Sequence, residues 1–297
     1  MRINTTVKAV WLACLILMPV TTVAASKITV LILDGHNNHN WKLTTPVLKQ
    51  ELEATGLFKV NVATAPPRND EMGNYHPDFS KYKVVVSNYT DLDNDGEWPT
   101  ATKRQFVKYI SSGGGFVAIH AALSAFPHWK EYNEIIGLGG WGGRDEHWGP
   151  YVYFWKGKEV RDSSPGSGGH HGTLHPYLVV IRDSDHPITR GLPHEWMHVK
   201  DELYDSLRGP AEHLTVLATA YSSPSSGGSG RDEPVLFTVR YGKGRIFCTT
   251  LGHDVEAMKG IGFITTFQRG TQWAAVGRVT QKVPKDFPTA TAVRAKQ

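Results

Sequence analysis

Apolar positions in the first half of the chain follow two alternating spacings. Four short runs of apolar and β-branched residues are each bounded by polar turns, at 28–33, 60–63, 84–86 and 116–119. Runs of this kind are typical of strands buried on both faces. Residues 43–57 and 100–111 between them carry apolar side chains at helical spacing. Strands that alternate with helices predict an α/β fold, a three-layer doubly wound sheet of the flavodoxin-like type.

The second half of the chain predicts further strands and one closing helix. Residues 234–240 and 245–250 are apolar runs joined by Tyr241-Gly242-Lys243-Gly244, a spacing that predicts a β-hairpin. Two more strands and the closing helix are expected from apolar runs, at 178–181, 214–218 and 261–276.

Residues 137–176 interrupt this regular pattern. The segment is rich in glycine, with tryptophan and histidine between the glycines. An irregular segment of this length is uncommon in a compact domain and is often functional. Residues 151–160 within it predict a short hairpin that turns at Lys156-Gly157-Lys158. We expect the segment to be a Gly-rich insertion or lid.

The first 25 residues have the pattern of a secretory signal peptide. Arg2 and Lys8 precede an apolar run, and Val23-Ala24-Ala25 satisfies the small-residue rule for cleavage. The run is shorter than the roughly 20 residues that span a bilayer, although a retained N-terminal anchor is the alternative. We expect a periplasmic or secreted protein without a membrane span, with one domain over 26–280 and a C-terminal tail over 281–297.

Removal of that segment changes the charge and the cysteine count. The formal net charge of +4 includes Arg2 and Lys8, so the exported chain is near +2. This mild balance has no basic block and gives no support for a nucleic-acid partner. Cys14 leaves with the signal and Cys248 remains alone, so an ordinary apolar core must hold the fold without an intrachain disulfide. The oligomeric state is not predicted.

Histidines follow several of the predicted strands. His36 and His39 come after the first strand, His120 after the fourth, and His253 after the C-terminal hairpin. Ligands of open α/β sheets bind beyond the carboxyl ends of the strands, so these imidazoles are expected at one edge of the sheet. Imidazole at that edge serves acid–base chemistry or binds a divalent metal.

The main group of carboxylates is Asp201-Glu202-Leu203-Tyr204. A carboxylate that joins two imidazoles would complete a three-ligand metal site with a position open for water or a substrate hydroxyl. The alternative is a solvated turn with no role in chemistry.

His194-Glu195-Trp196-Met197-His198 matches the pattern H-E-x-x-H of zinc peptidases. On a helix, the two histidines lie one turn apart and bind zinc, and the glutamate activates water. The preceding residues 185–193 are rich in turn formers, and no clear third ligand follows. A zinc peptidase is therefore an alternative function that requires a helix at 194–198.

Aromatic residues lie in or near the predicted loops and close to polar residues. Sugars offer an apolar face and a rim of hydroxyls, so such rings predict a carbohydrate surface, with ordinary loop packing as the alternative. The residues expected to contact the substrate are His36, His39, Trp41, His147, Trp148, His170, His171 and Tyr204.

Five motifs in order over residues 28–277 resemble the ThuA-like family, named for trehalose utilisation, within the class I glutamine amidotransferase-like superfamily. They are 113–121 (GGGFVAIHA), 186–193 (HPITRGLP), 201–204 (DELY), 241–247 (YGKGRIF) and 251–254 (LGHD). The resemblance implies a flavodoxin-like fold and a role in carbohydrate catabolism, including routes through 3-keto sugars.

The resemblance also implies roles for individual residues. His253 would occupy the position of the superfamily's catalytic histidine, with Asp254 beside it. His120 stands where the superfamily has a nucleophilic cysteine, and because imidazole cannot form the usual thioester, glutaminase activity is not expected. A divalent metal, zinc first, would be held by His120, Glu202 and His253.

The sequence thus predicts an exported enzyme that acts on a sugar or glycoside, with 3-keto derivatives among its substrates. A keto group beside an acidic C–H needs a base to remove the proton and a metal or donor to stabilise the enolate. His120, Glu202, His253 and Asp254 would supply metal-assisted or direct acid–base chemistry. The alternative is a non-catalytic carbohydrate-binding protein of the same fold.

Overall fold

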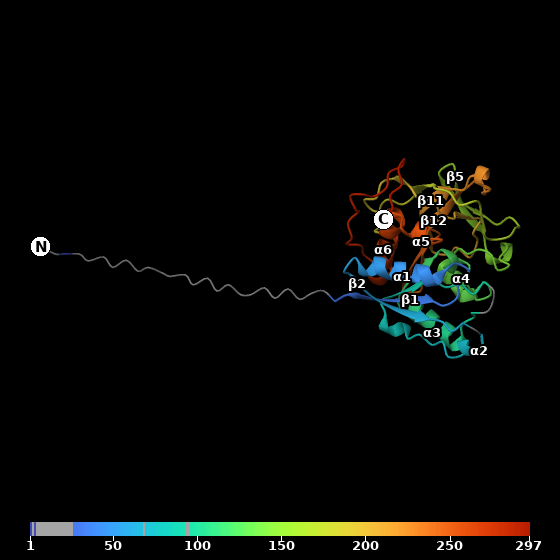
Figure 1. Ribbon diagram of the computed structural model, residues 1–297, viewed down its shortest axis with the longest axis horizontal. Helices are drawn as coiled ribbons and strands as arrows, with labels where there is room; N and C mark the ends of the chain where they lie inside the picture. Colours follow the sequence, from blue (N-terminus) through green and yellow to red (C-terminus); the bar gives the residue numbers. More distant parts are fainter. Residues whose placement is uncertain (2, 4–25, 68, 93–95) are drawn as a thin grey trace.

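The structure, a computed structural model, describes residues 1, 3, 26–67, 69–92 and 96–297 (Figure 1). The predicted signal segment 1–25 lies outside the described residues apart from positions 1 and 3. None of the described helices is both long enough and apolar enough to cross a bilayer.

The middle layer is a mixed sheet of 11 strands in which one half is parallel and the other antiparallel. The parallel half contains, in spatial order, β2 (Phe58–Thr64), β1 (Ile28–Asp34), β3 (Val84–Ser87), β4 (Gly115–Ile119) and β13 (Gly244–Thr249). The sheet continues antiparallel through β12 (Asp232–Tyr241), β11 (Leu214–Tyr221), β8 (Leu178–Ile181) and β9 (Glu195–Met197). The α/β prediction is confirmed, and the antiparallel half extends it, because periodicity does not say which strands pair.

Helices cover both faces of the sheet, so the fold has three layers. One face carries α1 (Trp41–Glu53), α5 (Val255–Met258) and α6 (Ile261–Val276), and the other carries α3 (Thr100–Ser111) and α4 (Lys130–Ile136); α2 (Asn69–Met72) is a single turn. Figure 1 shows β1 between α1 and α3. Alternate side chains of β1 enter the two cores: Val30 packs with Leu48 of α1, and Leu31 lies with Phe106 of α3. Burial on both faces explains the continuous apolar runs of these strands.

The glycine-rich segment 137–176 is irregular but ordered. It contains the predicted hairpin, formed by β5 (Tyr151–Trp155) and β6 (Lys158–Asp162), with β5 also paired to β12. Lys156 and Gly157 turn that hairpin with φ of 50° and 76°, the left-handed conformation of a tight two-residue turn. The short β7 (His170–His171) pairs with β10 (Tyr204–Asp205).

Two buried arginines hold this segment in place. Arg144 donates to the carbonyls of Ser124, Ala125, Gly140 and Trp141 and to the Asn133 side chain. Arg208 donates to the carbonyls of Gly149, Ser164 and Gly166. Buried carbonyls outside a sheet still need donors, and the five N–H groups of a guanidinium supply them together. These bonds account for an ordered segment with little regular structure.

The C-terminal residues 281–297 pack back onto the fold. Phe287 is buried, with its ring 5.4 Å from that of Trp196. The N–H of Met197 donates to the Thr289 carbonyl, and Lys296 pairs with Glu51 at 2.6 Å. The predicted tail therefore covers the face of the sheet that α6 also covers.

Candidate functional site

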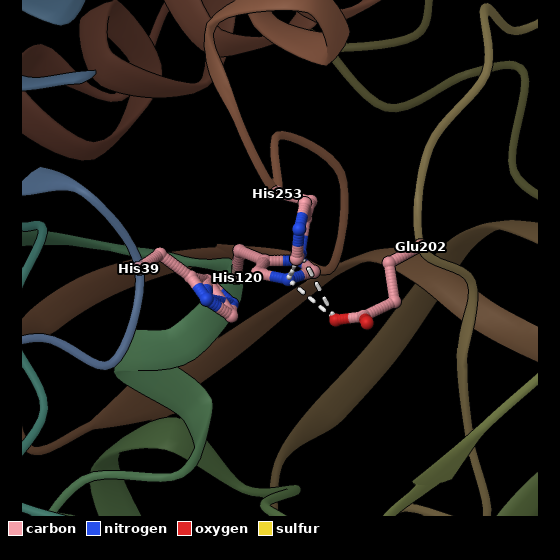
Figure 2. A group of neighbouring side chains, drawn as sticks. All are labelled: His39, His120, Glu202 and His253. Carbon is pink, nitrogen blue, oxygen red and sulfur yellow. Dashed lines mark hydrogen bonds and ion pairs between the residues drawn. The ribbon is translucent and has the colours of Figure 1, made fainter. Parts of the chain in front are cut away.

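Four side chains converge beyond the carboxyl ends of the parallel strands: His39, His120, Glu202 and His253 (Figure 2). His39 comes from the loop after β1, His120 directly follows β4, and His253 follows β13. Glu202 enters from the loop between β9 and β10. Each residue offers one ligand atom, and these atoms all lie within 4.8 Å of one another. We call these four residues the ligand group.

Three atoms of the ligand group have the spacing of metal ligands. The Glu202 Oε2 atom lies 3.2 Å from His120 Nε2 and 3.1 Å from His253 Nδ1. The two nitrogen atoms are 3.3 Å apart. Ligand atoms around a tetrahedral zinc ion, with bonds of about 2.0–2.1 Å, are roughly 3.3–3.4 Å apart. The three residues predicted as ligands therefore lie at distances that suit such an ion.

The hydrogen bonding of His120 places its Nε2 atom where it can bind a metal ion. Its Nδ1 atom lies 2.6 Å from the carbonyl oxygen of Thr250, and since a carbonyl only accepts, this nitrogen carries the hydrogen. Its Nε2 atom faces the carboxylate of Glu202, and a proton or a metal ion must lie between these two atoms, because two acceptors repel. A backbone carbonyl on the second ring nitrogen is how metal-binding histidines are commonly oriented. The donor set therefore fits a divalent metal.

His120 is held in an uncommon backbone conformation. Its φ is 47°, and it begins the 3-10 turn His120–Leu123 at the end of β4. A residue with a Cβ in this region stores about 1–3 kcal/mol of strain. The side chain is 2% exposed, so surrounding packing maintains the strain and fixes the imidazole against Glu202.

His39 completes the ligand group from the loop between β1 and α1. Its ring centroid lies 4.3 Å from that of His253, and its Nε2 atom is 3.5 Å from the Tyr204 hydroxyl. Asn37 fixes the loop, because its side-chain oxygen accepts from the N–H of His39 at 2.8 Å. Burial, with the nearby charges of His120 and His253, lowers the pKa of His39 to about 4. A neutral imidazole of this kind is a good metal ligand, whereas we had predicted a substrate contact.

Asp201 supports the ligand group from behind. Its Oδ2 atom accepts from the His198 ring and from the N–H of Gly252, each at 2.8 Å. Its Oδ1 atom accepts from the N–H groups of Glu202 at 2.8 Å and His253 at 3.1 Å. Burial opposes ionisation, but the hydrogen bond from His198 and the other donors outweigh it and lower the pKa of Asp201. We call Asp201, His198 and Gly252 the support network, because they join the two loops that carry Glu202 and His253.

The charges within the ligand group stabilise one another. Burial opposes ionisation of Glu202, but hydrogen bonds with His120 and His253 outweigh burial and hold its pKa below the ordinary range. The same hydrogen bond with Glu202 raises the pKa of His253. The His253 side chain is 24% exposed and that of Glu202 is 8% exposed, so His253 forms the accessible side of the group.

Two further predicted residues border the ligand group. The ring of Tyr204 lies against His120, with centroids 4.0 Å apart, and burial raises the pKa of its hydroxyl. His171 Nδ1 is 3.3 Å from the second oxygen of Glu202. The neighbouring His170 instead contacts Asp205 at 3.0 Å, because successive residues of a strand point to opposite faces.

The remaining predicted residues lie outside the ligand group. Asp254 is the N-cap of α5, and its carboxylate accepts from the Ala257 N–H at 2.8 Å. After the larger effect of the hydrogen bond with Glu202, the charge of Asp254 also raises the pKa of His253. The exposed His147 pairs with Asp145 at 3.0 Å. The ring of Trp148 lies 6.4 Å from the ring of His128.

His36 and Trp41 belong to the loop and helix on the other side of His39. The Nε2 atom of His36 lies 2.6 Å from the Pro66 carbonyl, and Trp41 is the first residue of α1. Both line a small hollow at the same edge of the sheet.

The H-E-x-x-H prediction is wrong. Glu195–Met197 forms strand β9, paired with β8, and not a helix. His194 is exposed, and His198 is buried with its Nε2 on Asp201. The turn-rich segment 185–193 and pairing with β8 overrode the helical spacing, so the two histidines do not form the peptidase arrangement.

Comparison with known proteins gives a consistent picture. The model of the ThuA family, described as trehalose utilisation, matches residues 29–274. A ThuA-like protein from Parabacteroides merdae is 48% identical, with a TM-score of 0.88, covering 91% of this chain and 98% of its own. A ThuA-like protein from Bacteroides uniformis shares the fold at 18% identity and a TM-score of 0.57, over 89% of this chain and 97% of its own. The search of curated proteins gives no match.

Proposed function

The chain belongs to the ThuA family, and on that basis we propose an exported enzyme of carbohydrate catabolism that acts on a sugar or glycoside, 3-keto derivatives included. The observation that carries the proposal is the ligand group, three imidazoles and one carboxylate at the edge of the sheet where ligands bind. Export to the periplasm or the exterior rests on the sequence pattern of residues 1–25.

A divalent metal, zinc first, would be held by His39, His120, Glu202 and His253. Imidazole with one carboxylate suits zinc, and the buried His120 is oriented for it by the Thr250 carbonyl. When bound, such an ion polarises a carbonyl or hydroxyl oxygen of the substrate.

The chain's own residues would position the substrate and move protons beside that ion. His171 is 41% exposed at the border of the site, and its Nδ1 atom lies 2.9 Å from the Gly172 carbonyl oxygen and 3.3 Å from Glu202 Oε1. An imidazole in this position can accept or return a proton next to a sugar carbonyl. Tyr204 packs on His120 and keeps its ring in place.

The proposal is tested by elemental analysis of the purified protein and of His120→Ala and His253→Ala. We expect near-stoichiometric metal in the wild type and its loss in both variants. His147→Ala is the matched control, because this side chain is 82% exposed and should leave the metal content unchanged. Metal that survives both substitutions would overturn the site.

Turnover assays then separate an enzyme from a binding protein. The metal-loaded protein is offered glycosides and their 3-keto derivatives, and release of the free sugar or a shift of the keto group is followed. We expect turnover that falls at least tenfold in His171→Ala, with its metal content kept. Metal and sugar binding without any turnover would instead support the non-catalytic carbohydrate-binding protein.

A further inference from the structure

The indole ring of Trp141 borders the side of the site that Tyr204 and His171 form. Its centroid lies 4.5 Å from the ring of Tyr204 and 6.1 Å from the ring of His171. Tyr204 packs on His120, and His171 contacts Glu202, so Trp141 is one side chain away from the ligand group. We propose that Trp141 is the platform on which a pyranose ring of the substrate stacks, an inference that rests on the proposed function.

The backbone of Trp141 is fixed in a conformation that bulky residues rarely adopt. Its φ is 57°, in the left-handed region that is unfavourable for a large side chain. The N–H of Trp141 donates to the Gly168 carbonyl at 2.7 Å, and its own carbonyl accepts from the N–H of the buried Arg144 at 3.1 Å. Strain of this kind persists only where the surrounding structure fixes it, and it is common at ligand sites. His120, with a φ of 47°, is another example beside the same site.

Two glycines make room for the indole ring. A Cβ on Gly169 would lie 2.5 Å from the Trp141 nitrogen and 2.8 Å from its Cε3 atom, and a Cβ on Gly140 would lie 2.7 Å from the Gly169 Cα. The indole therefore packs directly on the backbone of Gly169, two residues before His171. The N–H of Gly169 donates to the Ser206 carbonyl at 2.8 Å, which ties this backbone to the strand of Tyr204. The glycine-rich segment thus fixes the indole relative to the imidazole of His171.

Trp141 offers the kind of surface that a sugar ring needs. It is half-buried, so part of the indole stays accessible while the rest packs against the core that contains Tyr204. A pyranose with equatorial hydroxyls has C–H groups on its faces, which suit an aromatic ring, and hydroxyls at its rim, which suit polar groups. The polar groups next to the indole are imidazoles, with the side chain of His171 41% exposed and that of His253 24% exposed. A pyranose stacked on Trp141 would direct a hydroxyl or keto oxygen of its rim toward the ligand group.

The test is calorimetry and ligand-observed NMR with methyl β-D-glucopyranoside, a single ring whose hydroxyls are all equatorial. Trp141→Leu keeps an apolar side chain without an aromatic face, and Trp141→Phe keeps an aromatic ring. We expect Trp141→Leu to weaken binding about tenfold and Trp141→Phe to stay within about threefold of the wild type. The matched control is Trp155→Ala, a tryptophan of the same segment that is 52% exposed on β5, and it should bind like the wild type.

The wild type gives a second measurement that does not depend on the folding of any variant. Saturation of its aromatic protons should transfer to the ring C–H protons of the bound glucoside. Sorbitol, an open-chain polyol without a ring face, should not bind. Absence of this transfer, binding of sorbitol as tight as that of the glucoside, or equal affinity of Trp141→Leu and the wild type would each overturn the inference.

Metal content measured on the same samples separates this inference from the proposed function. If the wild type and Trp141→Leu both hold metal and bind the glucoside equally, the platform is wrong and the metal-centre proposal stands. If folded Trp141→Leu loses the glucoside while no preparation holds metal, the platform stands and the metal-centre proposal fails.

Discussion

Asp201 and Glu202 are neighbours in the chain, yet they belong to regions with opposite properties. In the support network, both oxygens of Asp201 accept from N–H groups that the backbone and His198 hold in place. In the ligand group, Glu202 faces imidazole nitrogens that can carry lone pairs. The carboxylate of Asp201 finds its donors within the fold, whereas the carboxylate of Glu202 needs a proton or a metal between it and the imidazoles. The donors around a carboxylate, and not the residue type, decide whether it supports the fold or does chemistry.

The strongest test of this comparison is the stability of Asp201→Ala. The substitution leaves the His198 ring and three backbone N–H groups buried without acceptors, so the free energy of unfolding should fall by about 3–5 kcal/mol. Denaturant unfolding of the metal-free protein measures this loss. Glu202→Ala is the matched control and should cost clearly less, since the partners of Glu202 are ring nitrogens at the site and not buried backbone N–H groups. Equal losses would contradict the division into two regions.

Glu233 extends the comparison to a carboxylate that is buried like Asp201 but has fewer donors. It is 1% exposed, and its Oε1 atom accepts from the Ser229 hydroxyl at 2.7 Å. Burial raises its pKa to about 7, whereas the fixed donors of Asp201 lower the pKa of that residue.

The sign of the resulting pH dependence follows from this shift. The folded state holds the proton of Glu233 up to about pH 7, whereas the unfolded chain releases it near pH 4.3. The stabilisation is thus complete below about pH 4.3 and is lost as the pH rises to about 7, a change of up to about 4 kcal/mol at 1.36 kcal/mol per pKa unit. The free energy of unfolding, measured between pH 5 and 8, should fall with rising pH in the wild type and should fall less steeply in Glu233→Gln. Identical slopes would show that burial does not control this carboxylate.

Metal affinity should depend more strongly on Glu202 in the ligand group than on Asp201 in the support network. Loss of an outer-shell partner typically costs 10–100-fold in metal affinity, so loss of the Glu202 ligand should cost more than about 100-fold. Glu202→Gln keeps the shape and removes the charge, and competition with a chelator measures the change. Asp201→Asn should lie within the outer-shell range. A larger effect in Asp201→Asn than in Glu202→Gln would reverse the assignment of the two roles.

The sequence predicts those residues of the site whose position depends on neighbouring residues in the chain, and it does not predict those whose role depends on distant contacts. The strand-end rule correctly brings His120 and His253 to one edge, because it needs only the apolar runs that precede them. The ligand position of His39 was not predicted, since it depends on the turn that Asn37 forms with the His39 N–H. The sequence also does not separate Asp201 from Glu202, because their difference lies in groups such as Gly252, which is 51 positions from Asp201 in the chain.

In the fold, too, features set by neighbouring residues were predicted and features set by distant contacts were not. The strands of the parallel half were predicted from their apolar runs, and so was the β12–β13 hairpin from its turn residues. In the antiparallel half, β8, β11 and β12 were predicted as strands, but their order was not, because it depends on long-range pairing, for example β8 between β11 and β9. Strand β9 carried an apparent helical spacing that its pairing with β8 overrides. Periodicity reports what an element buries and not which neighbour it meets.

The smallest expected effect comes from the two histidines of the H-E-x-x-H segment. His198→Ala leaves Asp201 Oδ2 with one donor fewer in a fully buried place, so it should lower the free energy of unfolding by about 1–3 kcal/mol. His194 is exposed at the edge of β9, and His194→Ala should change stability by less than about 0.5 kcal/mol. Neither substitution removes a ligand, so both variants should keep their metal. If both lost it, the segment would be the metal site after all, and the roles of support network and ligand group would have to be exchanged.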